Sequence, residues 1–173
     1  MIEEIKKEYS NVYGNMIKEK NLLRPTSLGY SGSASSDSVF ELFKKIKLKK
    51  YKNFIDLGSG DGKVVLIASL FTKATGIEID DELLKVSRKM KNKLKMKDAS
   101  FIKGDFLDQD LSKFDVIFMN PDNPLYDIER KLRNEMKEDS KLIICGGLYR
   151  PLNMKLEKSY TAENVKFFVY SKG

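Results

Sequence analysis

"NFIDLGSGDGKVVLIASLF", residues 53–71, contains a short apolar run with an acid, three glycines within five residues, and a second apolar run. A short apolar run that stops at glycines is typical of a buried strand. Glycines let the backbone approach a ligand closely, and the N–H groups at the start of the following helix attract anions. The stretch therefore predicts a strand over 53–57, a ligand-binding turn and a helix over 62–72.

The same alternation continues to residue 145. We expect further helices over 81–96 and 124–138 and further strands over 74–79, 99–103, 114–119, 141–145, 155–163 and 164–172. Alternating strands and helices form right-handed crossovers and a parallel sheet covered on both faces, whereas the last two runs adjoin like a hairpin. The predicted fold is α/β: a three-layer αβα, doubly wound, mostly parallel seven-stranded sheet with a C-terminal antiparallel hairpin.

Residues 1–50 have a different pattern. Apolar residues at helical spacing predict an amphipathic helix at the start, and a Gly/Ser-rich loop over 26–38 follows it. Ser36 or Asp37 can cap a second helix. We therefore divide the chain into an N-terminal helical extension, residues 1–50, and a core domain, residues 51–173.

Composition excludes several classes of function. The chain has 173 residues, a net charge of +7, no histidine and one cysteine. Without histidine, Ser-His-Asp and Cys-His catalysis and most zinc sites are excluded, and nothing gives reason to expect a metal. Cys145 cannot form an internal disulfide, the apolar runs are too short to span a membrane, and no leader peptide is evident. We expect a soluble, cytoplasmic protein whose basic charge favours acidic partners.

The glycine turn also narrows the ligand. A phosphate-loop site needs Ser or Thr after the lysine, but Val64 follows Lys63. A dinucleotide site is a closer alternative because Glu78 ends the second expected strand. However, the spacing is G-x-G-x-G rather than G-x-G-x-x-G, so the turn alone does not decide between ligands.

Four motifs in order resemble those of class I S-adenosylmethionine-dependent methyltransferases: "FIDLGSGDGKV" at 54–64, "GIEID" at 76–80, "GDFLD" at 104–108 and "FDVIFMNP" at 114–121. The resemblance covers about residues 53–145. It implies that residues 51–173 form a methyltransferase domain whose cofactor is S-adenosylmethionine.

The resemblance also implies cofactor-binding roles. Asp56 would orient the glycine turn and reach the methionine end of the cofactor, whose amino-acid moiety would pass along Gly58, Ser59 and Gly60. Glu78 would accept hydrogen bonds from both ribose hydroxyls, which suits a carboxylate with two acceptor oxygens.

Further along the chain, Asp105 would accept from the adenine amino group and the Phe106 amide would donate to the ring. Ile79 and Phe106 would flank the adenine, and Asn120 would close the site. Taken singly, each position also fits a structural role such as a turn cap or a surface ion pair.

Asn120, Pro121 and Asp122 are the predicted catalytic residues. Similar enzymes that methylate exocyclic amines have Asn/Asp-Pro-Pro-aromatic here, with the aromatic ring stacked on a base, whereas this chain has "NPDN". Asn123 or Tyr126 would then contact the substrate, and Asp122 would suit the proton of a lysine ammonium. Asp122 starting a turn before the helix is an equal alternative.

Substrate recognition is the least constrained prediction. The loop over 26–38 is either a linker or a lid, with Tyr30 beside the methyl site, and a partner subunit could assist. We predict an S-adenosylmethionine-dependent methyltransferase that acts on an amine nitrogen of RNA or of a protein lysine. The alternative is a non-catalytic subunit with this cofactor fold that binds RNA or a partner enzyme. Cys145 is interpreted as a buried, inert thiol.

Overall fold

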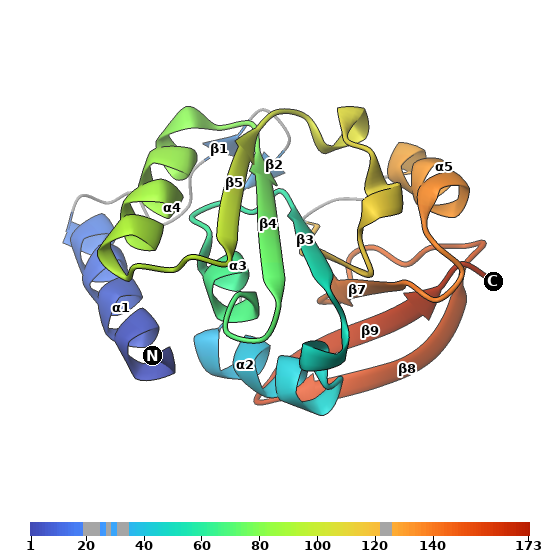
Figure 1. Ribbon diagram of the computed structural model, residues 1–173, viewed down its shortest axis with the longest axis horizontal. Helices are drawn as coiled ribbons and strands as arrows, with labels where there is room; N and C mark the ends of the chain where they lie inside the picture. The colour runs from blue at the N-terminus through green and yellow to red at the C-terminus, as the bar shows by residue number, and fades with distance from the viewer. Residues whose placement is uncertain (19–24, 27–28, 31–34, 122–125) are drawn as a thin grey trace.

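The computed structural model describes residues 1–18, 25–26, 29–30, 35–121 and 126–173 (Figure 1). One seven-stranded sheet forms the centre of the molecule. Its strands are β3 (Asn53–Leu57), β4 (Lys73–Glu78), β5 (Ala99–Lys103), β6 (Val116–Met119), β7 (Lys141–Cys145), β8 (Lys155–Ala162) and β9 (Val165–Ser171).

The order of the strands across the sheet is β5-β4-β3-β6-β7-β9-β8. The strands from β5 to β7 are parallel, and β9 and β8 complete the sheet in antiparallel pairs. The chain winds outward from β3 to β5 and then returns to place β6 beside β3. This return creates a topological switch point at the carboxyl ends of β3 and β6, where sheets of this kind bind ligands. The predicted fold class is confirmed.

Helices cover both faces of the sheet, and Figure 1 shows α1 and α4 beyond the β5 edge and the β8–β9 hairpin at the opposite edge. Neighbouring residues of one strand enter different cores: Phe54 joins the first cluster and Ile55 the second. The first core lies under α1 (Ile2–Lys18), α2 (Ser36–Lys45), α3 (Lys63–Ala68) and α4 (Asp81–Lys93). The second lies under α5 (Tyr126–Glu135) and the short 3₁₀ turns η2 (Phe106–Asp108) and η3 (Leu111–Lys113).

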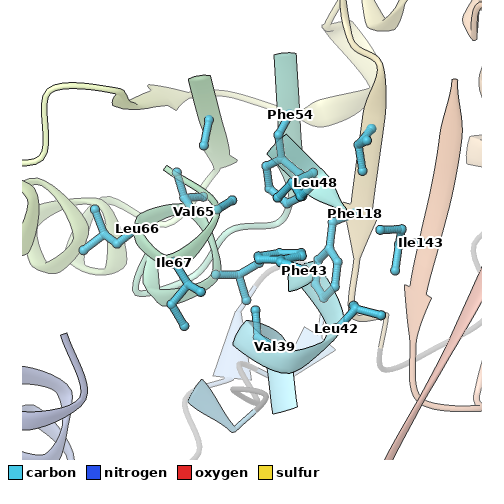
Figure 2. Packing of buried hydrophobic residues seen from close by; sticks show 14 of the residues in the cluster. Val39, Leu42, Phe43, Leu48, Phe54, Val65, Leu66, Ile67, Phe118 and Ile143 are labelled. Atoms are coloured by element: carbon cyan, nitrogen blue, oxygen red, sulfur yellow. The ribbon is translucent and has the colours of Figure 1, made fainter. Parts of the chain in front are cut away.

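The N-terminal helices share the core of the sheet. Figure 2 shows Phe43 of α2 among side chains of β3 and β6, and its ring lies 5.4 Å from that of Phe54 and 6.3 Å from that of Phe118, both nearly edge-on. Such edge-to-face pairs add to the gain from burying the rings. Ile5 and Tyr9 of α1 belong to the same cluster. The division of the chain at residue 50 stays a prediction.

Several boundaries differ from those expected, for local reasons. Ser35, rather than Ser36 or Asp37, is the N-cap of α2, because its hydroxyl accepts from the Ser38 N–H. Strand β6 starts at Val116 rather than at 114, since Phe114 is still the C-cap of η3 and its N–H donates to the Leu111 carbonyl.

Two expected helices and the expected loop also differ in detail. Helix α3 ends at Ala68, before the expected residue 72, in a turn tightened by the Leu70 N–H to Ile67 carbonyl bond. Helix α5 is described over Tyr126–Glu135, inside the expected 124–138. The expected loop contains a two-residue ladder, β1 (Pro25–Thr26) with β2 (Gly29–Tyr30). In the described part of the chain, no helix is both long enough and apolar enough to cross a bilayer.

Candidate functional site

The predicted site residues gather where the parallel strands end. Asp56 lies in β3, Glu78 is the last residue of β4, and Asp105 and Asn120 follow β5 and β6. The paired strands β3, β4, β5 and β6 are parallel, so these positions lie along one edge of the sheet. The fold therefore brings the four together at the switch point.

The turn after β3 has a backbone that suits glycine. Gly58, Gly60 and Gly62 have φ angles of 75°, 54° and 83°, in the left-handed region. The N–H groups of Gly58 and Ser59 both donate to the Ile77 carbonyl of β4, at 3.0 and 2.9 Å. The turn is thereby fastened to the neighbouring strand.

Close packing also explains Gly62 and a further glycine, Gly76. A Cβ on Gly62 would lie 2.5 Å from the Ser87 Cβ and 2.7 Å from the Phe101 ring, and one on Gly76 would lie 2.5 Å from the Ser59 Oγ. The Ser59 side chain therefore packs toward β4, and within the described residues its buried hydroxyl has no hydrogen-bond partner. Any contact of Ser59 with a ligand would thus come from its backbone.

Glu78 is buried and faces the glycine turn. Its Oε2 accepts from the Gly60 N–H at 2.8 Å, and its Oε1 accepts from the N–H groups of Ile79 and Asp80 at 2.8 and 2.9 Å. The alternative role, an ion pair with a surface lysine, is not among its interactions in the described structure. The carboxylate ties the ends of β3 and β4 together.

Asp56 is a buried acid that lies near two other acids, Glu78 and Asp61. Burial raises its pKa well above the ordinary value, and the negative charges of Glu78 and Asp61 raise it further. A protonated or partly protonated carboxyl can donate a hydrogen bond, so Asp56 can serve as donor or acceptor toward a ligand at this edge.

Four residues of this site were not predicted from the sequence. Asp61, between two of the glycines, accepts from the Tyr13 hydroxyl at 2.7 Å, and its carbonyl accepts from the Tyr9 hydroxyl at 2.8 Å. The Lys63 ammonium lies 4.9 Å from the centroid of the Tyr13 ring. Burial lowers the pKa of Lys63, partly offset by Asp61. The sequence signal was two tyrosines one helical turn apart, which we had interpreted only as an apolar face.

The residues after β5 lie next along this edge of the sheet. Asp105 is the N-cap of η2 and accepts from the Leu107 N–H at 2.8 Å through Oδ1. Phe106 is buried in the second core, and Ile79 is 36% exposed. The turn-capping role weighed for Asp105 is therefore present, and its contact with an adenine stays a prediction.

The predicted substrate residues are only partly described. Asn120 is exposed directly after β6, and Pro121 is buried. Asp122 and Asn123 lie outside the described residues. Tyr126 opens α5 and Tyr30 ends β2, but the side chains of both are outside the described part.

Cys145 ends β7 on the buried face of the sheet. Burial, with the nearby Asp56 charge, raises the pKa of its thiol to about 12. A thiol that stays protonated is a poor nucleophile, which supports the inert interpretation.

Comparison with known proteins agrees with this geometry. Residues 56–146 match the family model described as the ANTKMT methyltransferase domain. No curated protein matches the chain. The matched segment begins at Asp56 and ends just after β7, so it contains the whole set of strand ends described above.

Three solved structures illustrate the fold. An RNA methyltransferase from Salinibacter ruber, in complex with S-adenosyl-L-homocysteine, is 20% identical with a TM-score of 0.69, over 81% of this chain and 93% of that one. The putative methyltransferase yhhF of Escherichia coli is 22% identical with a TM-score of 0.64, over 78% and 84%. A ribosomal protein L11 methylase of Lactobacillus delbrueckii subsp. bulgaricus is 16% identical with a TM-score of 0.59, over 80% of both.

Proposed function

The chain belongs to the ANTKMT methyltransferase domain family and is a class I S-adenosylmethionine-dependent methyltransferase, and from that premise we propose that it methylates the ε-amine of a protein lysine. An exocyclic amine of RNA is the second candidate. The proposal concerns the substrate and the roles of single residues.

The polar groups at the strand ends fit S-adenosylmethionine. The left-handed glycines keep side chains away from the turn, and Glu78 and Asp105 place carboxylate acceptors after neighbouring strands, as ribose hydroxyls and an adenine amino group require. Gly58, Ser59 and Gly60 would hold the amino-acid end through their backbone. When bound, the cofactor supplies an electrophilic methyl group on a sulfonium.

One observation carries the proposal: Asn120 is the first residue after β6 and is exposed beside the glycine turn. Leu57 of β3 pairs with Met119 of β6, so Gly58 and Asn120 follow at the same level of the edge. A side-chain amide oxygen there can accept an amine hydrogen and direct the nitrogen lone pair toward the methyl carbon. Alignment of this kind is the main requirement for a displacement at carbon.

A lysine substrate also has to lose a proton, because its ammonium has no lone pair. Asp122, two residues after Asn120 in the sequence, is the group we assign to accept that proton. An aromatic residue that would stack on a flipped base is absent from position 123, which favours an aliphatic amine over a base.

RNA remains the second candidate because of charge. The net charge of +7 favours a polyanion, and the similar Salinibacter ruber structure is an RNA methyltransferase. Phosphate contacts would make turnover on RNA fall steeply with salt, whereas turnover on a protein substrate would depend on salt less.

Calorimetric titration with S-adenosylmethionine and, separately, NAD tests the cofactor. A transfer assay with tritiated methyl groups, on RNA and on protein fractions, then tests the substrate. We expect binding of S-adenosylmethionine alone and label in protein that acid hydrolysis releases as methyl-lysine. Label confined to RNA would replace the first candidate by the second, and absence of cofactor binding would contradict the site.

A further inference from the structure

Helix α1 is fastened to the centre of the glycine turn by two tyrosines. Tyr9 and Tyr13 are four residues apart and therefore lie on one face of the helix. The Tyr13 hydroxyl donates to Asp61 Oδ2 at 2.7 Å, and the Tyr9 hydroxyl donates to the Asp61 carbonyl at 2.8 Å. One residue of the turn is thus held through its side chain and its backbone by two tyrosines that precede it by 48 and 52 residues.

Asp61 in turn fixes the start of α3. Its Oδ1 accepts from the Lys63 N–H at 3.1 Å, so the carboxylate bridges α1 and the first turn of α3. The Lys63 ammonium lies 4.9 Å from the Tyr13 ring centroid, within the range of a cation–π contact. Tyr13 therefore contacts both residues that flank Gly62.

The turn needs such a constraint. Gly60 and Gly62 have no side chains and have access to more backbone conformations than any other residue type, so Asp61 supplies the one side chain among the three. The Gly60 N–H is also the donor to Glu78 Oε2, at 2.8 Å. Displacement of Asp61 would thus move the amide that meets Glu78.

We propose that Tyr13 is a positioning residue for the methyl-donor site: by holding Asp61 it keeps the glycine turn in the conformation that binds S-adenosylmethionine. The inference rests on the proposed cofactor site. It assigns to α1, outside the segment that matches the family model, a share of the cofactor affinity.

Tyr13 separates this role from core packing better than Tyr9 does. Tyr9 is 1% exposed and belongs to the first core, so its substitution also disturbs packing. Tyr13 is only partly buried, and Tyr13→Phe removes the hydroxyl while keeping the ring beside Lys63. A hydrogen bond to a charged acceptor contributes more than one between neutral groups.

The test compares Tyr13→Phe with Tyr160→Phe, which makes the same chemical change on β8, at the far edge of the sheet. Calorimetry with S-adenosylhomocysteine, well below the melting temperature, gives the affinity. Hydrogen exchange of residues 58–63 in the protein without cofactor gives the mobility of the turn. We expect Tyr13→Phe to weaken binding about 5- to 20-fold and to speed exchange, as loss of a charge-assisted bond predicts, and Tyr160→Phe to change neither.

A second variant, Asp61→Asn, keeps the shape of the side chain and removes its charge, so it should weaken binding in the same direction. Unchanged affinity and exchange in both variants, with normal binding by the wild type, would overturn the inference alone. A lower melting temperature with unchanged affinity would assign Tyr13 a purely structural role and would also overturn it. Failure of the wild type to bind either cofactor form would instead contradict the proposed function.

Discussion

The edge of the sheet that carries the candidate site has two halves, and a comparison of their buried carboxylates shows how they differ. In the half that we propose for the cofactor, at the ends of β3, β4 and β5, the Glu78 carboxylate binds the N–H groups of Gly60 in the glycine turn and of Ile79 after β4. In the half that we propose for the substrate, beyond β6 and β7, the equally buried Glu129 of α5 binds the N–H groups of Leu152 and Asn153 in the segment after β7. Both halves thus use a buried carboxylate to hold backbone.

What each carboxylate holds is different. Glu78 holds a glycine-rich turn, in which the backbone itself would contact the proposed cofactor. Glu129 holds a segment that displays side chains, with Leu148 and Leu152 exposed by 69% and 79%. Backbone atoms can bind a cofactor that many enzymes share, whereas side chains on loops bind a particular substrate. The predictions below separate these two uses.

Asn120→Ala should have the largest effect, and only on chemistry. Loss of the amide that orients the amine should lower the turnover number about 100-fold or more, because misalignment of the nucleophile is costly. The dissociation constant for S-adenosylhomocysteine should stay within about twofold, since binding depends on the cofactor half. Asn92→Ala, exposed on α4, is the control. Normal turnover by Asn120→Ala would remove Asn120 from the chemistry.

Gly62→Ala should cost the most stability. A Cβ there would meet the Ser87 Cβ at 2.5 Å on a backbone with a φ angle of 83°. We expect a loss of about 2–4 kcal/mol in the free energy of unfolding from strain and overpacking together. Gly58→Ala, with a φ angle of 75° but no atom within 4 Å of the added carbon, should lose about 1–2 kcal/mol. Denaturant titration measures both free energies of unfolding. Equal losses would show that the neighbours of Gly62 move to make room for the added carbon.

Glu78→Ala should weaken binding of S-adenosylmethionine by about 1.5–3 kcal/mol, the range for hydrogen bonds to a charged acceptor. Glu129→Ala removes a carboxylate of the same burial from the substrate half and should leave that affinity unchanged while lowering turnover on the macromolecular substrate. Calorimetry and the transfer assay provide the two readouts. An equal loss of cofactor affinity in both variants would contradict the division into halves.

The sequence predicted the strands and the glycine turn of the proposed cofactor half well because their requirements are local. Backbone geometry within a few residues fixes each part of that half: the apolar run that ends in Leu57, the glycines after it, and the acid at the end of β4. All seven strands were expected close to their observed positions because each is a short apolar run between polar segments.

The sequence failed where contacts join distant segments. Helical spacing shows that Tyr9 and Tyr13 face inward, but it does not show that their hydroxyls reach Asp61. The cap of α2 was expected one or two positions late, at Ser36 or Asp37, because three serines and an aspartate within four positions can all cap a helix. Only the bond from the Ser38 N–H to the Ser35 hydroxyl identifies the cap.

The two halves should also respond to pH in opposite senses. Burial and the charges of Glu78 and Asp61 raise the pKa of Asp56 in the folded state. Burial acts in the same direction on Glu129, but hydrogen bonds from Leu152, Asn153 and Tyr149 outweigh it and lower the pKa. The stability linked to Asp56 is therefore present below its unfolded pKa and is lost as pH rises through the folded value. The stability linked to Glu129 is present above its unfolded pKa and is lost as pH falls through the folded value.

Asp56→Asn should accordingly raise the melting temperature slightly at neutral pH, and the gain should shrink as pH approaches about 4, where the carboxyl of the unfolded wild type also begins to take up a proton. Glu129→Gln should lower the melting temperature at neutral pH, and its deficit should shrink in the same acidic range. Thermal melts of both variants between pH 4 and pH 8 measure the two slopes. Parallel slopes would mean that Asp56 is ionised and compensated in the folded protein. Opposite slopes would support the proposed division of the site. Asp56 in the cofactor half would then be a buried acid that a cationic ligand can stabilise in its ionised form, whereas the Glu129 carboxylate in the substrate half is already stabilised by hydrogen bonds from its own loop.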